Sequence, residues 1–491
     1  MRTVVATFET MRERPAVVRA AAVAAVVLGS VVTALMLDRG QWFLVVGLAL
    51  AVPAVLLFHR NPLLALGFWL ALGPVVQVVE AGGTGRKMYW LFHRGLPVLI
   101  LGLIVVARLA GVTRRKLTLG WVEFLMAGYL IAAILSIQFT SPDVLATSYH
   151  LYDRVAIPMA LFLLVRWYPP GRRNLEAAVP IVAFVLAVQL VAGVMQWFAP
   201  DLVPGAWLGR AGSRTTGSLR HPNVYGVVVL AAGAFLFHMG HTSGRGKVPR
   251  WVYSAAFAIS VGAAFLTLSR ATWLAALLAL AVMAFLHPAA VRRMVVAMVS
   301  LSIVVVLSTP VEPVIERAMD RFYSDQSRNS ALSRLPVVLA SLRMFEAKPV
   351  AGWGFGNFDL YDRDFHGRVG DLFVPDRDEA SHNIYLTILA EQGLIGILLY
   401  LGPAIVLLAK TPAAWRRLPR DGPLGRKFLV VLWLTPAMHF VVNNFSNMRI
   451  PFGLGVYWLT LGLIAGIVLP PRVRADEPRL LEAIGLGRLE R

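Results

Sequence analysis

The chain has 491 residues, of which 57% are hydrophobic and only 15% are charged, and its formal net charge is +20. Soluble globular chains carry about 25% charged residues, so this composition excludes an ordinary soluble protein. The complete lack of cysteine excludes disulfides, thiolate catalysis and Cys-ligated metals. The basic residues lie in short linkers between apolar runs, with no Gly-rich phosphate loop or continuous basic helix, so we expect no nucleic-acid partner.

Apolar runs of membrane-spanning length occur along the whole sequence. At about 20 residues per membrane helix, they predict an all-α, polytopic bundle of about 12–14 transmembrane helices. The candidate spans are residues 16–37, 41–58, 62–79, 95–112, 120–138, 154–168, 176–199, 223–240, 251–268, 271–287, 292–309, 382–409, 427–445 and 451–470. This pattern divides the chain into N-terminal transmembrane helices (1–308), a large, partly helical loop (309–381), C-terminal transmembrane helices (382–470) and a tail (471–491).

The basic linkers predict the orientation of these spans. Clusters such as Arg114-Arg115-Lys116, Arg172-Arg173 and Arg292-Arg293 fall on one side of the membrane if the spans alternate, and both termini fall on that side too. Short basic linkers face the cytoplasm. The loop 309–381 is therefore expected to face outward, and the arginines near the outer ends of the spans need another explanation, such as a bound anion.

The segment 214–223 is the first candidate for such an anion site. Arg214 and Arg220 are followed by Pro222, which favours the first turn of a helix, and by Asn223, an unusual residue for a lipid-facing helix. Arginines beside a helix start favour phosphate binding. An ordinary basic loop with a capping turn explains the same residues equally well.

Arg270 is the second candidate, since it stands alone between two apolar runs in Ser269-Arg270-Ala271-Thr272-Trp273-Leu274. An arginine at membrane depth costs on the order of 2.5 kcal/mol or more, which favours a functional role. The alternative is an interfacial arginine whose charged end reaches the water beside a tryptophan.

The loop 309–381 adds further arginines, Arg328, Arg334 and Arg343. Residues 330–346 have helical spacing, with an apolar face predicted to consist of Leu335, Val338, Leu339, Leu342 and Phe345. Such a helix would present Arg334 near its start. The run from Gly352 to Phe358 alternates glycines with large side chains, and a structural turn is the simpler interpretation.

His382 is the candidate catalytic residue. Ser381 is predicted to cap the following helix, which would put His382 in the first turn, where the helix dipole favours the neutral imidazole. A neutral imidazole can accept a proton from a hydroxyl group. Gly393 returns to the face of His382 roughly 16 Å deeper, and Glu391 is expected to be a buried structural partner. A polar cap at the interface is the alternative role for His382.

Together these segments resemble the O-antigen ligase and polymerase superfamily of membrane glycan enzymes. The resemblance rests on Arg-Thr-Thr-Gly-Ser-Leu-Arg-His-Pro-Asn at 214–223, Arg270 with Leu274, and Gly-Trp-Gly-Phe-Gly-Asn-Phe at 352–358. Its most specific part is His382-Asn383, then nine residues, then Gly393-Leu-Ile-Gly396. Leu399 stands where the family sometimes has threonine.

The resemblance implies a glycosyltransferase of the bacterial inner membrane with its site on the periplasmic face. The implied donor is an undecaprenyl-diphosphate-linked glycan, and the implied acceptor is lipid A–core or another glycan. An inverting transfer without metal or cofactor is implied, with His382 as base and Arg214, Arg220, Arg270 and Arg334 on the diphosphate. Asn223, Asn383, Gly393 and Gly396 would support the site, with the two glycines leaving room for the isoprenoid tail among the membrane lipids.

Three other functions fit parts of the sequence. A polysaccharide polymerase of the same superfamily would use the same donor, and no motif separates it from a ligase. A metal-dependent, dolichol-type transferase would need acidic metal ligands in the first outer loop, and the short loop Asp38-Arg39-Gly40 argues against this function. A transporter or flippase would show internal repeats and midplane charges, and Glu391 is the main residue in its favour.

Overall fold

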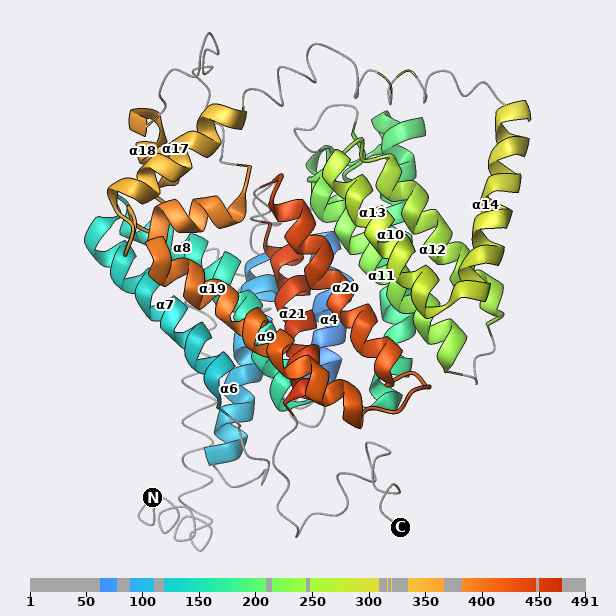
Figure 1. The fold of residues 1–491 in the computed structure, drawn as a ribbon, viewed down its shortest axis with the longest axis horizontal. Coiled ribbons are helices and arrows are strands. Elements are labelled where there is room, and N and C mark those ends of the chain that lie inside the picture. Colours follow the sequence, from blue (N-terminus) through green and yellow to red (C-terminus); the bar gives the residue numbers. More distant parts are fainter. Residues whose placement is uncertain are drawn as a thin grey trace, which may run out of the picture. The chain divides into compact units, whose positions relative to one another are not determined.

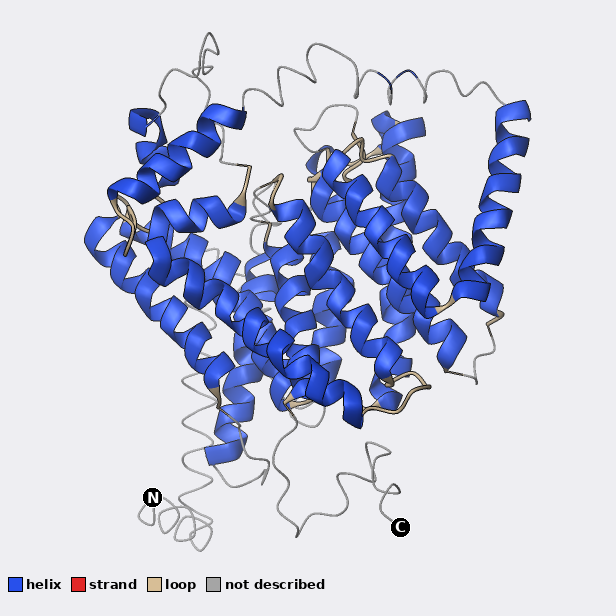
Figure 2. Cartoon of the chain, in the orientation of Figure 1, coloured by secondary structure: helices blue, strands red, loops and turns tan. Residues whose placement is uncertain are grey.

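We analysed a computed structural model of the chain. It describes residues 62–76, 89–109, 119–208, 214–243, 248–308, 334–365, 382–446 and 450–469, together with residues 316 and 319. All of these belong to one compact unit, Pro62–Arg491. Every regular element within the described residues is a helix (Figure 2). The predicted all-α class is therefore confirmed.

The helices follow the apolar runs closely (Figure 1). The two predicted spans 16–37 and 41–58 lie outside the described residues, and each of the others coincides with a helix. In chain order these helices are α4 (Pro62–Val76), α6 (Leu96–Leu109), α7 (Trp121–Thr140), α9 (Ile157–Trp167), α10 (Arg172–Phe198), α11 (Pro222–Thr242), α12 (Arg250–Phe265), α13 (Arg270–Leu286), α14 (Pro288–Ser308), α19 (Ile384–Arg417), α20 (Arg426–Asn443) and α21 (Pro451–Val468).

Shorter elements connect and cover these helices. They are the π-helical segments η2 (Trp90–Gly95) and η3 (Tyr152–Ala156), the 3-10 segments η4 (Pro200–Leu202), η5 (Gly205–Trp207) and η6 (Gly217–Leu219), and the helices α8 (Val144–Leu151), α17 (Arg334–Ala347) and α18 (Phe358–Phe365). Within the described residues, 5 helices are long and apolar enough to cross a membrane: α7, α10, α11, α19 and α21. Shorter apolar helices cover 62–75, 91–105 and 270–286.

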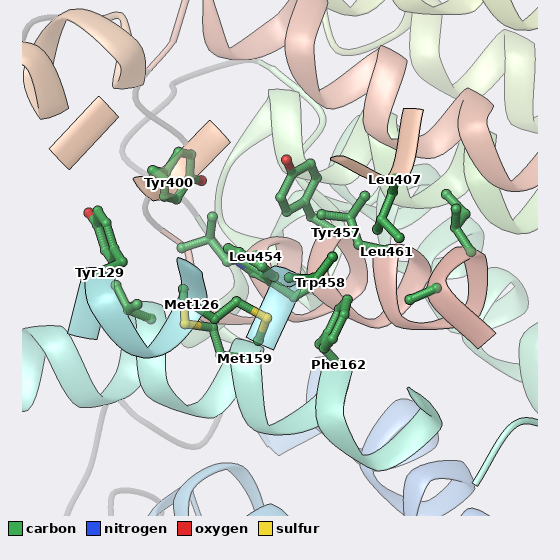
Figure 3. Close-up of a cluster of buried hydrophobic side chains, with 14 of the residues drawn as sticks. Met126, Tyr129, Met159, Phe162, Tyr400, Leu407, Leu454, Tyr457, Trp458 and Leu461 are labelled. Carbon is green, nitrogen blue, oxygen red and sulfur yellow. The ribbon is translucent and has the colours of Figure 1, made fainter. Parts of the chain in front are cut away.

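A large hydrophobic core within the described residues lies where α7, α9, α19, α20 and α21 meet, and Figure 3 shows part of it. Glycines allow close contact here, because a Cβ at Gly462 of α21 would lie 2.6 Å from the carbonyl oxygen of Phe162 in α9. Lipid tails are as apolar as these side chains, so packing at short range is what holds such helices together.

Of the five long apolar helices, α11 and α21 are the most enclosed, with 72% of the apolar window of each buried. α11 packs against α10, α12 and α13. A Cβ at Gly226 would lie 2.1 Å from Thr272 of α13, and one at Gly233 would lie 2.5 Å from Ser260 of α12. This packing fixes the starts of α11 and α13, which carry two of the predicted anion-binding segments.

The helix predicted at 330–346 exists as α17, and the face that packs against the rest of the protein differs from the apolar face that the spacing predicts. The buried residues are Pro336, Val337, Ala340, Ser341 and Met344, whereas Leu335 and Leu342 are 43% and 37% exposed. Val337 and Met344 pack with Phe358 and Ala390. Several small and medium side chains suit this contact with α19, and apolar periodicity alone does not distinguish the two faces.

Candidate functional site

Three helix starts share an unusual backbone conformation. Arg220, Leu268 and His382 are the non-glycine residues with positive φ in the described part of the chain, at 60°, 49° and 50°. Each immediately precedes the N-cap residue of a helix, namely His221 before α11, Ser269 before α13 and Asn383 before α19. Such conformations cost roughly 1–3 kcal/mol and concentrate at functional sites, so these three starts are the first structural sign of a site.

Asn383, not Ser381, caps α19. The Asn383 side-chain oxygen accepts hydrogen bonds from the backbone N–H groups of Tyr385 and Leu386 at 3.0 and 3.1 Å. The prediction that His382 lies in the first turn is therefore wrong, because His382 stands before the cap. Serine and asparagine cap helices about equally well, so the sequence did not distinguish them.

His382 is expected to be neutral for a different reason from the helix dipole. Burial lowers the pKa of His382 from 6.5 to about 4, and the nearby Arg334 guanidinium adds to the shift. At neutral pH the imidazole therefore carries no charge and can accept a proton. The Arg334 interaction also brings the start of α17 to the start of α19.

A second imidazole, His221, belongs to the same cluster. Its Nδ1 accepts the backbone N–H of Asn223 at 3.2 Å. Burial lowers the pKa of His221 to about 4, and the electrostatic interactions with the Arg214 guanidinium and with the neighbouring His382 ring contribute to the shift. A neutral ring that accepts at Nδ1 carries its proton on Nε2, so His221 offers a hydrogen-bond donor beside His382.

These interactions define what we call the histidine–arginine cluster: Arg214, His221, Arg334 and His382. The sequence prediction included Arg214, Arg334 and His382 but missed His221. One feature of the sequence could have indicated His221. It is a polar residue directly before Pro222, at the start of a helix, in a segment that already contains two arginines. Arg220 and Arg270 are exposed residues at the starts of α11 and α13.

Asn223 joins the two segments that are predicted to bind an anion. It is only 7% exposed, and its side-chain oxygen accepts hydrogen bonds from Ser269 and from Thr272, the latter at 3.1 Å. The Nε of Arg214 donates to the Thr267 carbonyl at 3.1 Å. The start of α11 and the start of α13 are therefore one structural unit, which explains why a polar residue opens an otherwise apolar helix.

Two glutamines in α10 hold the segment that follows Arg214. The Gln196 side-chain oxygen accepts from the N–H groups of Thr216 and Gly217 at 2.8 and 2.9 Å, and that of Gln189 accepts from Ser218 at 3.2 Å. Gly217 has φ of 56°, and a Cβ there would lie 2.4 Å from Gln189. The sequence prediction missed both glutamines, although two amides in one apolar span were a visible signal.

α19 is broken at Gly393, where φ is 61° and ψ is −157°, and it changes direction there (Figure 1). The segment 349–354 fills the break. Trp353 and Gly354 donate N–H groups to the carbonyls of Ala390 and Glu391 at 3.0 and 2.7 Å. Leu394 and Ile395 donate to the carbonyls of Pro349 and Val350 at 2.9 and 3.2 Å. The loop thus supplies the partners that the broken helix lacks.

Glycines on both sides of this contact, in the segment 352–358 and at the break in α19, allow the loop to dock. Gly352, Gly354 and Gly356 all have positive φ, and a Cβ at Gly393 would lie 2.4 Å from the Val350 carbonyl oxygen. The space beside Gly393 is therefore filled by protein backbone, which corrects the expectation of room for an isoprenoid tail. Gly396 faces its own helix, since a Cβ there would lie 2.2 Å from Gln392.

Two further hydrogen bonds hold the first part of α19, between its cap at Asn383 and the break at Gly393. Glu391 is 2% exposed, and one carboxylate oxygen accepts the N–H of Phe358 at 3.3 Å, as expected of a buried structural partner. The Asn383 amide donates to the Asn444 carbonyl at 3.3 Å, which ties α19 to the end of α20. His382 is thus held between a docked loop and a second helix.

The comparisons with known proteins agree with this geometry. A family model described as O-antigen ligase matches residues 255–401. The chain carries an O-antigen ligase domain. A search of curated proteins found no match. The matched residues make up less than a third of the chain and run from α12 into α19.

The ligase domain includes only part of the histidine–arginine cluster. Arg334 and His382 lie within residues 255–401, together with Arg270 and the break at Gly393. Arg214, His221 and Asn223 lie before it and reach the domain through the packing of α11 on α13. The match supports a membrane enzyme of the O-antigen ligase and polymerase superfamily, which acts on lipid-linked glycans.

The lowered pKa of His382 predicts the acid side of the pH–activity profile. Because only the neutral imidazole can accept a proton, a role of His382 as base predicts that kcat/KM of the wild type for glycan transfer falls only as the pH drops toward about 4. Replacing Arg334 by glutamine removes a cation that lowers this pKa, so the acid limb should move to higher pH. Arg343→Gln, on the same helix, should leave the limb in place. A wild-type limb at pH 6.5 would contradict the assignment.

Proposed function

We propose that the protein transfers a glycan from undecaprenyl diphosphate to a sugar hydroxyl of an acceptor such as lipid A–core. The observation that carries this proposal is the convergence of a neutral histidine, His382, with the cations Arg214 and Arg334 at the starts of the helices. A base for a hydroxyl and positive charges for a diphosphate are the two requirements of such a transfer. The ligase domain supplies the reaction class.

In the proposed reaction, His382 removes the proton from the acceptor hydroxyl as its oxygen attacks the anomeric carbon of the donor. The new C–O bond forms on the face opposite the diphosphate, so the anomeric configuration inverts. The bond from the anomeric carbon to the diphosphate oxygen breaks, and undecaprenyl diphosphate leaves. The proton on His382 then passes to solvent.

Arginines are proposed to stabilise the departing diphosphate. Arg214 and Arg334 belong to the cluster, while Arg220 and Arg270 extend it at the exposed starts of α11 and α13. Charge-assisted hydrogen bonds contribute about 1.5–3 kcal/mol each, so two or three of them lower the barrier substantially. The Nε2–H of His221 adds a neutral donor that does not repel these cations.

The proposed metal independence gives a direct prediction. Since guanidinium groups carry the charge of the leaving diphosphate, transfer by purified protein should proceed at the same rate with and without excess EDTA. Adding Mg²⁺ or Mn²⁺ to EDTA-treated protein should give no increase. A rate that falls at least tenfold with EDTA and returns with Mg²⁺ would contradict the arginine mechanism.

Reconstitution of the purified protein in a lipid bilayer, which stands for the proposed inner membrane, tests whether it transfers the glycan. Purified protein in lipid vesicles is given undecaprenyl-diphosphate-linked glycan and lipid A–core, and products are identified by gel and mass. Glycan on lipid A–core is the expected result. Longer glycan still attached to undecaprenyl diphosphate would identify a polymerase with the same site, and uptake of the donor without any new bond would overturn the enzyme assignment in favour of a transporter.

A further inference from the structure

A cavity of about 220 Å³ lies beside the first part of α19 and is separate from the arginine segments. Ile384, Ile388 and Glu391 of α19 form one wall. The other walls come from α7, α8, η3, α18, α21 and the glycine-rich loop at Phe355 and Gly356. No residue of the lining comes from the segments that carry Arg214, Arg220, Arg270 or Arg334.

The cavity is close to His382 along the chain. Ile384, in its wall, is two residues from His382, and two residues span at most roughly 7 Å. The hydrogen bonds from Asn383 to Tyr385 and Leu386 fix this first turn. His382 itself is not among the lining residues, but the wall of the cavity begins within roughly 7 Å of its Cα and comes from segments other than those proposed to hold the diphosphate.

Aromatic rings form the apolar part of the lining. Tyr129 and Tyr400 line the cavity, and their ring centroids are 5.5 Å apart. Figure 3 shows both rings with Leu454, which also lines the cavity. The Gln392 amide donates to the Tyr129 hydroxyl at 2.8 Å and fixes that ring. Flat aromatic surfaces beside polar groups suit the C–H faces of a sugar ring.

The charged groups of the lining have both signs. Asp359 and Glu391 are acidic, Arg154 is basic and His150 is titratable. Two carboxylates disfavour a phosphate, whereas sugar hydroxyls both donate to carboxylates and accept from a guanidinium. The volume is below the roughly 300–1,000 Å³ of pockets for drug-sized ligands, which favours a ligand of one ring.

We propose that this cavity binds one pyranose ring of the acceptor glycan and holds its hydroxyl at His382. This proposal rests on the proposed function. The acceptor, rather than the donor, is assigned to the cavity because the donor sugar is bonded to the diphosphate, and the arginines that would hold the diphosphate lie in other segments.

Asp359→Asn tests the cavity with little risk to folding, because Asp359 is exposed. We expect KM for the acceptor to rise about tenfold or more, as for the loss of one charge-assisted hydrogen bond, while KM for the donor stays within twofold. Asp364→Asn is the matched control, since Asp364 is exposed on the same helix and does not line the cavity. An unchanged acceptor KM in Asp359→Asn would overturn the proposal.

A binding measurement separates this proposal from the reaction. The full-length purified protein is mixed with core oligosaccharide freed from lipid A, or with repeat-unit glycan freed from its carrier, and contact is read by saturation-transfer NMR. Binding of either glycan that is lost in Asp359→Asn and kept in Asp364→Asn supports the cavity even if no transfer occurs. Transfer by the wild type with equal glycan binding in both variants would overturn the cavity and leave the function standing.

Discussion

Replacing His382 by alanine is expected to slow glycan transfer at least about 100-fold, the lower end of what a general base contributes. His382 precedes the cap of α19, and the side-chain capping hydrogen bonds of this helix come from Asn383, so the substitution leaves the cap in place. The arginines that hold the diphosphate are unchanged in this variant. We therefore expect undecaprenyl diphosphate to raise the thermal stability of the variant and of the wild type equally, while only the wild type forms product.

The matched control for this prediction is His241→Ala. His241 is an imidazole at the opposite end of α11 from His221, and it contacts the Phe237 carbonyl at 2.9 Å. Its loss should leave the transfer rate within about twofold. Full activity in His382→Ala would refute the base assignment, and equal losses in the two variants would point to a general effect of removing histidine on folding.

Gly393→Ala is expected to have the largest structural effect. A Cβ there would lie 2.4 Å from the Val350 carbonyl oxygen, a backbone atom that has no freedom to rotate away. The backbone conformation of Gly393, with φ 61° and ψ −157°, is essentially restricted to glycine and adds about 1–3 kcal/mol for a residue with a side chain. Because the loop 349–354 docks through four backbone hydrogen bonds at this break, we expect a fall of several degrees in Tm, faster proteolysis within 334–365 and loss of transfer.

Gly262→Ala provides the comparison for Gly393→Ala. Gly262 lies inside α12, and a Cβ there would meet no atom within 4 Å. Alanine in a compatible helical position stabilises by about 0.4–1 kcal/mol, so Tm should stay the same or rise slightly. If Gly393→Ala had the same Tm and protease pattern as Gly262→Ala, the docking of the loop into the break would be wrong.

The positions of the helices were predictable because a membrane imposes a simple rule. About 20 apolar residues are needed to cross it, and the apolar runs from 62–79 to 451–470 all became helices. The arginines that we expect to face outward and His382 were also visible, because ionisable residues at span ends are unusual. The family resemblance rested on the same residues, and the match to residues 255–401 agrees with it.

The details that the sequence did not reveal all depend on contacts between distant segments. The sequence did not reveal which face of α17 packs against the protein: Val337 and Met344 pack with residues of α18 and α19, whereas Leu335 and Leu342 are exposed. The break at Gly393 was missed because a glycine in an apolar run also fits a continuous helix. Its cause is Val350, far away in the sequence.

His221 was missed for a related reason. Its value to the cluster comes from Arg214 and His382 beside it and from the Asn223 N–H that fixes its tautomer. None of these contacts is implied by its place before a proline, where a simple capping role explains a polar residue. Spatial proximity is what turns this cap into a candidate for the site.

The fate of the carrier lipid tests the central claim most directly. Wild-type protein in vesicles is given a fluorescent glycan on undecaprenyl diphosphate and an excess of lipid A–core, and the free carrier and the glycosylated acceptor are measured together in one turnover. We predict equal amounts of undecaprenyl diphosphate and glycosylated acceptor, and neither in His382→Ala. Release of the carrier by both proteins, or a carrier that stays loaded beside an intact acceptor, would contradict the account.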